Sequence, residues 1–195
     1  MRTANIKRDT RETRIQLALN LDGTGRSGVS TGVGFLDHML ELFARHGDFD
    51  LDLTCRGDTQ VDFHHSVEDS GICLGRAFAE ALGDKRGITR YGQFLLPMDE
   101  TLVLCAVDLS GRDYLGWAVD LPARKVGDFD TELAKEFWLG FVRNCPGSIH
   151  IRQLAGENTH HILEAVFKGM GRALKMAAAP HEKHRDEIPS TKGVL

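Results

Sequence analysis

The length, composition and charge of the chain leave few broad classes open. Its 195 residues, 42% hydrophobic and 27% charged, are enough for one globular domain of ordinary size or two small ones. The net charge of -4 gives no sign of nucleic-acid binding, and no apolar run is long enough to span a membrane. The charged N-terminal segment lacks the apolar stretch of a secretion signal, so we expect a cytoplasmic protein.

The first half of the chain predicts alternating strands and helices. Residues 15–21 and 49–55 alternate between apolar and polar side chains, as strands do. Helices are expected over 35–45 and from 63 to near 83, where apolar residues recur at helical spacing. Residues 22–28 match the dinucleotide pattern G-x-G-x-x-G, but no helix follows directly, and we interpret the segment as a flexible turn.

The second half repeats this order of elements. Strands are expected at 101–109, 114–121 and 148–153, and helices at 132–143 and 159–178. The repeat predicts an internally duplicated α+β fold, in which each half has a mainly antiparallel sheet covered by helices on one face.

Three segments follow from this duplication. We assign 1–87 to the first α+β half, 88–180 to the second, and 181–195 to a polar tail. The tail is too polar to pack on its own, so we expect it to be disordered or to act as a mobile flap.

The most informative motif is H-H-x-x-E, which occurs at 64–68 and again at 160–164. Each copy begins an expected helix and follows a capping residue, Asp62 or Asn158, two positions upstream. One copy alone is better explained as chance histidines on a solvated helix end. Two copies with equal spacing favour two equivalent banks of metal ligands brought together by the duplication.

The helical setting explains why these residues suit metal ions. Adjacent histidines on a helix point about 100° apart, so one motif suits two different ions, and the glutamate lies on the same face as both. The positive end of the helix dipole disfavours imidazolium and keeps the rings able to bind a metal. We expect a further ligand from the matching earlier helix of each half, His38 in the first and Glu136 in the second.

The predicted ligands contain nitrogen and oxygen donors only. The set is His38, His64, His65, Glu68, Glu136, His160, His161 and Glu164. Such a set suits octahedral Mn²⁺ or Fe²⁺ better than structural zinc, although ligand softness alone does not choose between Mn, Fe, Co and catalytic Zn. The four cysteines form no C-x-x-C pair and are expected to be buried, reduced thiols.

These residues resemble a known family, imidazoleglycerol-phosphate dehydratase of histidine biosynthesis. The resemblance runs from about Arg8 to the end, and its motifs lie at 34–40, 62–69, 158–168 and 189–193. Glu136 stands where several relatives carry histidine, but glutamate can also bind a metal. The resemblance implies a hydro-lyase that converts imidazole glycerol phosphate to imidazole acetol phosphate, with two Mn²⁺ ions per active site. It also implies a 24-subunit shell whose active sites lie between subunits.

The substrate's chemistry suggests a mechanism. The proton to be lost at C2 is not acidic, but two metal ions holding the imidazole favour imidazolate by lowering the pKa of its N–H. Imidazolate can expel the C3 hydroxyl to give a diazafulvene-like intermediate, and loss of the C2 proton yields an enol that ketonises. The resemblance implies that Glu12 performs the acid–base step. Without the resemblance, Glu12 reads as an exposed charge at a strand edge.

The substrate phosphate requires fixed cations and hydrogen-bond donors. The resemblance assigns this role to Arg90, Arg112, Lys168, Ser190, Thr191 and Lys192. Lys168 also lies one turn beyond Glu164 on the metal face of its helix, whereas Arg90 and Arg112 would otherwise read as solvated charges. Ser190 and Lys192 imply that the tail closes over bound substrate. For His46, substrate contact and a structural hydrogen bond are equally compatible with the sequence.

Two other functions remain open from the residues alone. A metal-storage shell would keep both histidine motifs but would not need Arg90, Arg112, Lys168 or Lys192. A dinuclear hydrolase would direct a metal-bound water at a phosphoester. Ketone formation without phosphate release distinguishes dehydration from both.

Overall fold

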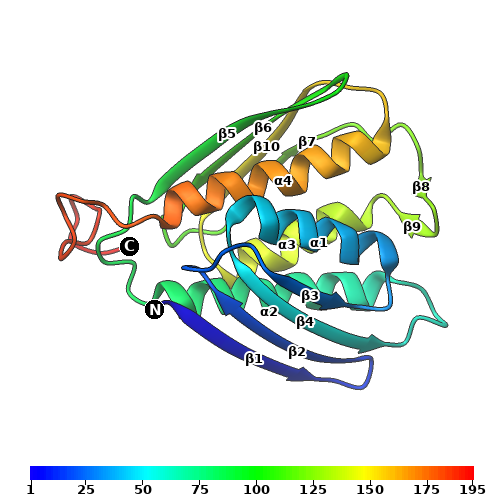
Figure 1. The fold of residues 1–195 in the computed structure, drawn as a ribbon, viewed down its shortest axis with the longest axis horizontal. Coiled ribbons are helices and arrows are strands. Elements are labelled where there is room, and N and C mark those ends of the chain that lie inside the picture. Colours follow the sequence, from blue (N-terminus) through cyan, green and yellow to red (C-terminus); the bar gives the residue numbers. More distant parts are fainter.

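Two four-stranded sheets enclose four helices in the computed structural model, which describes residues 1–195 (Figure 1). The first sheet contains Thr3–Asp9 (β1), Thr13–Asn20 (β2), Ser27–Ser30 (β3) and Asp50–Gly57 (β4). The second contains Tyr91–Met98 (β5), Thr101–Asp108 (β6), Tyr114–Ala118 (β7) and Ser148–Ala155 (β10). The helices are Gly34–Gly47 (α1), His64–Leu82 (α2), Leu133–Asn144 (α3) and Thr159–Ala178 (α4). A short hairpin pairs Lys125–Val126 (β8) with Phe129–Asp130 (β9).

The two sheets have the same topology. Their strand orders are β1-β2-β4-β3 and β5-β6-β10-β7. In each sheet the first three strands pair antiparallel and the last strand pairs parallel to its neighbour. Helices α1 and α2 therefore correspond to α3 and α4. The predicted α+β fold with an internal duplication is confirmed.

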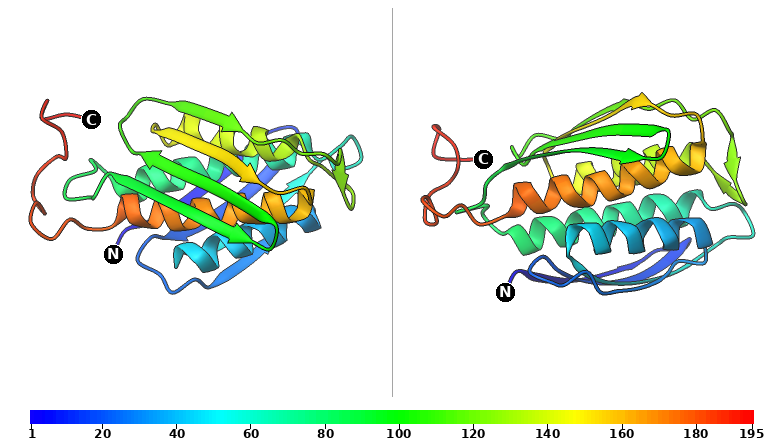
Figure 2. Two further views of the ribbon diagram at one scale, coloured as in Figure 1. Left: turned by 90° about the horizontal axis from the view of Figure 1, so that it is seen from above. Right: turned by 45° about the horizontal axis from the view of Figure 1, so that its top comes forward.

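The helices form the inner layers of the molecule and the sheets the outer layers (Figure 2). Helix α2 packs on β1 and β2, and α4 packs on β5 and β6. Each helix packs on a helix from the other half of the chain: α1 packs on α4, and α2 packs on α3. Rings from both halves meet at this interface, as where Phe43 and Trp138 lie with ring centroids 6.0 Å apart. The halves therefore share one hydrophobic core.

Glycines let these helices approach closely. A β-carbon at Gly71 in α2 would collide with the carbonyl oxygen of Phe137 in α3. A β-carbon at Gly171 in α4 would meet the carbonyl oxygen of Phe43 in α1 at 2.6 Å. Side chains at these two positions would separate the layers, so the glycines help to determine which helices become neighbours.

The helices all begin at the same end of the molecule, on the right in Figure 1, and the views in Figure 2 agree. The tail, residues 181–195, lies at the opposite end. It forms turns rather than helix or strand, and backbone hydrogen bonds join it to Gly87: His181 N donates to Gly87 O, and Gly87 N to Glu187 O. None of the four helices combines the length and the apolarity that crossing a membrane requires.

Several elements differ from the sequence-based expectation. All four predicted helices are present, but the strand expected over 114–121 ends at Ala118. Strands β1, β3 and β5 and the β8–β9 hairpin were not predicted. Each of the three missed sheet strands lies at the edge of its sheet, where polar residues, short length and proline are tolerated. Burial of the cysteines agrees with the prediction, and it raises the pKa of Cys73, Cys105 and Cys145 to about 12.

Candidate active site

Both H-H-x-x-E motifs lie in the first turn of a helix. Asn158 caps α4, and its side chain accepts hydrogen bonds from the backbone N–H groups of His160 (3.0 Å) and His161 (3.4 Å). In α2 the cap position is occupied by Phe63, while Asp62 accepts a hydrogen bond from the His64 N–H at 2.7 Å. The predicted cap is therefore confirmed for α4, and in α2 the carboxylate acts from one position further out.

Three candidate ligands converge where α1 meets α4. His38, His160 and Glu164 each offer a ligand atom, and the three atoms lie within 4.8 Å of one another. His160 Nε2 is 3.4 Å from Glu164 Oε2. Two imidazoles and a carboxylate without a thiolate are suitable donors for Mn²⁺, so these residues fit the predicted ion.

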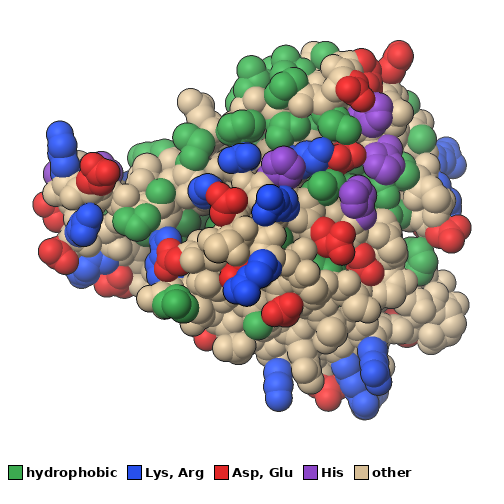
Figure 3. Space-filling model, viewed as in Figure 1, with side chains coloured by type: hydrophobic (Ala, Val, Ile, Leu, Met, Phe, Trp, Pro, Cys, Tyr) green, Lys and Arg blue, Asp and Glu red, His purple; other side chains and the backbone are tan.

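This cluster combines residues from the two halves of the chain. The sequence predicted a further ligand from the earlier helix of each half, but spacing along the chain did not indicate which motif that ligand would join. His38, from the first half, lies with the motif of the second half, because α1 packs on α4. Figure 3 shows histidine and acidic side chains gathered over the beginnings of the helices.

The motif of the first half is less complete. His64 Nε2 lies 3.9 Å from Glu68 Oε2 on α2, and Glu136 lies half-buried in the first turn of the neighbouring α3. These three residues do not form a compact three-ligand cluster of the kind seen at His38. One chain thus contains one converged cluster and one more open set of candidate ligands.

The second histidine of each motif is held by a carboxylate that the sequence did not single out. His65 Nδ1 is 3.0 Å from Asp58 Oδ2, and His161 Nδ1 is 2.8 Å from Glu100 Oε2. The hydrogen bond to Asp58 raises the pKa of His65, and that to Glu100 raises the pKa of His161. The same contact with His161 lowers the pKa of Glu100 to about 2. Both carboxylates lie in turns, where sequence patterns give no signal for such contacts.

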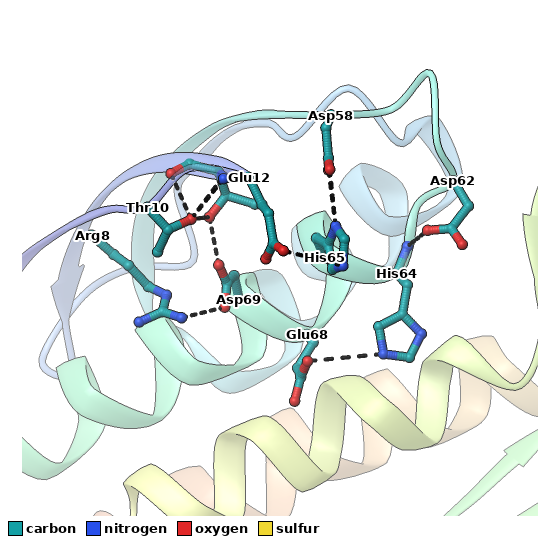
Figure 4. A network of polar contacts seen from close by, with 10 residues as sticks. Arg8, Thr10, Glu12, Asp58, Asp62, His64, His65, Glu68 and Asp69 are labelled. Carbon is teal, nitrogen blue, oxygen red and sulfur yellow. Dashed lines mark hydrogen bonds and ion pairs between the residues drawn. The ribbon is translucent and has the colours of Figure 1, made fainter.

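Glu12 lies beside the first motif, at the tip of the β1–β2 hairpin (Figure 4). Its Oε1 is 3.8 Å from His65 Nε2. The hairpin is fastened to α2 by Asp69, which pairs with Arg8 at 2.8 Å and accepts a hydrogen bond from the Thr13 hydroxyl. Because Asp69 is buried and directly follows Glu68, this network fixes Glu12 relative to the face of α2 that carries the candidate ligands.

Lys168 and His46 lie close to the converged cluster. Lys168 forms an ion pair with Glu164 one turn earlier on α4. Burial raises the pKa of Glu164, but the hydrogen bond and charge of Lys168 outweigh it and lower the pKa overall. Burial and the charge of Lys168 lower the pKa of His46, which favours its neutral ring. A cation is therefore fixed next to the candidate ligands.

The other predicted phosphate ligands lie at the tail end of the molecule. Arg90 Nε donates to Asp108 at 2.7 Å, and a second Arg90 nitrogen donates to the carbonyl of Pro189 at 2.8 Å. Ser190, Thr191 and Lys192 follow Pro189 directly. Arg112 follows Gly111, whose backbone packs against Leu195. Within one chain this group is separated by the length of the helices from the histidines (Figure 1).

Comparison with known proteins identifies the family. A family model described as Imidazoleglycerol-phosphate dehydratase matches residues 31–174. The chain belongs to the imidazoleglycerol-phosphate dehydratase family. It is 59% identical over 194 residues to the imidazoleglycerol-phosphate dehydratase of Pelobacter propionicus, covering 100% of this chain and 99% of that protein. It is 53% identical over 195 residues to that of Azorhizobium caulinodans, covering 100% and 99%.

Solved structures of imidazoleglycerol-phosphate dehydratases share the fold. The crystal structure from Staphylococcus aureus superposes with a TM-score of 0.82 at 40% identity, covering 91% of this chain and 99% of that one. The structure from Pyrococcus furiosus in complex with (S)-C348 gives 0.84 at 39% identity, covering 97% and 100%. The resemblance inferred from the sequence motifs is confirmed. Dehydratases are hydro-lyases, and this is the enzyme class of the chain.

Proposed function

We propose that the chain removes water from imidazole glycerol phosphate to give imidazole acetol phosphate, a step of histidine biosynthesis. Membership of the dehydratase family supports this reaction. The observation in the structure that carries it is the convergence of His38, His160 and Glu164, which offers a metal ion two imidazoles and a carboxylate.

We propose two Mn²⁺ ions per active site as the cofactor. The residues that would hold them are His38, His64, His65, Glu68, Glu136, His160, His161 and Glu164. When bound, the ions supply Lewis acidity that makes the N–H of the substrate imidazole easier to ionise. The two histidine rings of each motif are steeply inclined to one another, with interplanar angles of 78° and 82° in the two copies. This arrangement suits two neighbouring histidines that bind different ions.

The proposed reaction begins with ionisation of the substrate ring, which expels the C3 hydroxyl as the leaving group. The diazafulvene-type product of this step then loses its C2 proton to give an enol, which becomes the ketone. Glu12 carries the side-chain proton in this proposal, which is supported by the Arg8–Asp69 network that holds its hairpin beside His65. A carboxylate at hydrogen-bond reach of the reacting carbon is what general acid–base catalysis requires.

We propose that groups at both ends of the molecule bind the substrate phosphate. Lys168 stands beside the converged cluster, and His46 adds a neutral ring near it. Arg90, Arg112, Ser190, Thr191 and Lys192 complete the proposed set at the tail end. Since one chain holds the histidines and the tail at opposite ends, we propose that active sites form between subunits of a homo-oligomer of 24 chains.

The direct test uses the manganese-loaded protein and imidazole glycerol phosphate. The proposal predicts formation of a ketone with no release of inorganic phosphate. Phosphate release without ketone would instead show a dinuclear hydrolase, and a protein that binds manganese without consuming the substrate would be a storage shell. Either of these results would overturn the proposed reaction.

A further inference from the structure

Two histidines, one in each half, have a carboxylate on the same ring nitrogen. Asp58 contacts Nδ1 of His65 through both of its oxygens, at 3.0 and 3.1 Å (Figure 4). Glu100 contacts Nδ1 of His161 at 2.8 Å. In both cases the carboxylate meets the ring on the side away from Nε2, so the second nitrogen of the ring is left for another partner.

These two carboxylates do not come from equivalent parts of the duplicated fold. Asp58 follows β4 and precedes α2, whereas Glu100 lies in the turn of the β5–β6 hairpin. The hairpin equivalent to β5–β6 in the first half is β1–β2, and its Glu12 lies 3.8 Å from Nε2 of His65 rather than on Nδ1. On the β5–β6 hairpin the corresponding place is taken by Asp99, 3.9 Å from Nε2 of His161. The shared Nδ1 contact is therefore not a simple consequence of the duplication. Two loops at different places in the duplicated fold each supply a carboxylate to Nδ1 of a histidine.

Glu100 is itself held in place by one backbone donor and one side-chain donor. It accepts hydrogen bonds from the Asn158 N–H at 3.0 Å and from the Thr101 hydroxyl at 2.9 Å. Asn158 is the cap of α4, so the position of Glu100 is tied to the helix that carries His161. A carboxylate fixed in this way fixes the plane of the ring that it contacts.

The chemistry of a carboxylate decides which ring nitrogen carries the hydrogen. An ionised carboxylate only accepts hydrogen bonds, so the neutral rings of His65 and His161 must carry their hydrogen on Nδ1. The Nε2 lone pair is then free. Metal-binding histidines commonly use this arrangement, in which a carboxylate orients the ring and makes the metal-binding nitrogen more basic.

We infer that Asp58 and Glu100 are positioning residues, which orient His65 and His161 and present Nε2 of each ring to a metal ion. This inference rests on the proposed metal centre and adds two residues to it. Neither carboxylate is a ligand in the proposal. Each acts through its histidine, so its loss should weaken metal binding without removing a donor atom.

The experiment is a titration of the metal-free, full-length protein with Mn²⁺, following the electron paramagnetic resonance signal of the free ion. We expect Asp58→Ala and Glu100→Ala to bind Mn²⁺ about 10–100-fold more weakly than the unchanged chain, the usual effect of losing such a partner. Asp58→Asn and Glu100→Gln keep the shape and one acceptor oxygen but lose the charge. Their affinities should lie between those of the alanine variants and the unchanged chain.

Matched controls separate this role from loss of charge or of folding. Asp62→Asn and Glu157→Gln remove a carboxylate charge near α2 and α4 without touching a histidine ring, and both should bind Mn²⁺ as the unchanged chain does. Thermal midpoints of the metal-free amide variants should match that of the unchanged chain at alkaline pH, where the histidine–carboxylate ion pairs no longer add stability. Unaltered affinity in Asp58→Asn, Glu100→Gln and both alanine variants would overturn the inference alone. Failure of the unchanged chain to bind Mn²⁺ would overturn the metal centre and the inference with it.

Discussion

The two ends of the molecule divide the predicted site between them. At the histidine end, candidate metal-binding donors lie near the beginnings of the helices, with Glu12 of the β1–β2 hairpin and Lys168 of α4 beside them. At the tail end, Arg90 and the residues after Pro189 offer cations and hydroxyls, but no cluster of metal-binding donors. The helices that connect the ends are packed into a single shared core, so the ends cannot approach each other within one chain. This difference supports the proposal that each end is half of a site and that a neighbouring chain supplies the other half.

The largest effect should come from Glu12 at the histidine end. Glu12→Gln keeps the side-chain shape but cannot take a proton, so we expect turnover to fall about 10²–10⁴-fold. Bound manganese should stay constant, because Glu12 is not among the proposed ligands. Steady-state kinetics and metal analysis check both expectations. Asp9→Asn, in an exposed position on the same hairpin, is the matched control, and normal turnover in Glu12→Gln would remove Glu12 from the mechanism.

A different loss is expected at the tail end. Lys192→Ala removes one proposed charge-assisted contact with the phosphate; such a contact is worth about 1.5–3 kcal/mol, so its loss should lower kcat/KM roughly 10–100-fold. The loss should appear largely in KM, in contrast to Glu12→Gln. Lys183→Ala, in the same tail but outside the proposed set, is the control. A KM equal to that of the unchanged chain would remove Lys192 from the phosphate site.

Deletion of the residues after Pro189 tests whether the tail serves catalysis more than folding. The segment contributes no residue to the hydrophobic core, so the thermal midpoint of the truncated chain should change little. Activity should fall at least as far as in Lys192→Ala, because Ser190 and Thr191 are lost with it. A truncated chain that keeps full activity would exclude a closing role for the tail.

The smallest effect concerns the pH dependence of stability in the metal-free protein. The pKa values of His65 and His161 are raised by Asp58 and Glu100, so the stability from these pairs is fully present below the ordinary histidine pKa of about 6.5. That stability is lost as the pH rises through the raised pKa values. We therefore expect the thermal midpoint to fall by a few °C above neutral pH.

The control for this prediction is the double variant Asp58→Asn, Glu100→Gln, in which the decrease should be smaller. His46, whose pKa is lowered by burial and by Lys168, contributes the opposite slope in both proteins and cancels in the comparison. The Arg90–Asp108 pair at the tail end adds no slope through Arg90, whose raised pKa keeps it charged. Equal slopes in the two proteins would contradict the assigned pKa shifts.

Much of the fold could be predicted because its helices and central strands have strong periodic patterns. Residues 49–55 alternate strictly, and β4 follows that alternation with its buried side chains. The edge strands were missed for a physical reason. In β1 the inward-facing position 8 carries a charged residue, Arg8, which pairs with the buried Asp69. Strand β5 contains Pro97. Sequence periodicity indicates strands that bury apolar side chains, and it does not indicate a strand whose inward-facing side chain forms an ion pair.

The sequence indicated residue types for the candidate site but not how they would be arranged. The repeated motif indicated the histidines, yet spacing along the chain could not show that His38 would join His160, because that contact depends on how α1 and α4 pack. Asp58 and Glu100 were missed because their contacts depend on loop geometry. The separation of the histidines from the tail is likewise a property of the assembled fold.

The most direct test of the divided site is complementation between two inactive variants. Glu12→Gln has a damaged histidine end, and the chain truncated after Pro189 has a damaged tail end. If sites form between chains, some sites in a mixed oligomer combine an intact histidine end with an intact tail. Co-assembly from equal amounts should then restore roughly a quarter of the unchanged enzyme's activity, as expected for random pairing of two chains. Mixed oligomers no more active than their two parents would contradict the account, because they would show that each chain completes its own site.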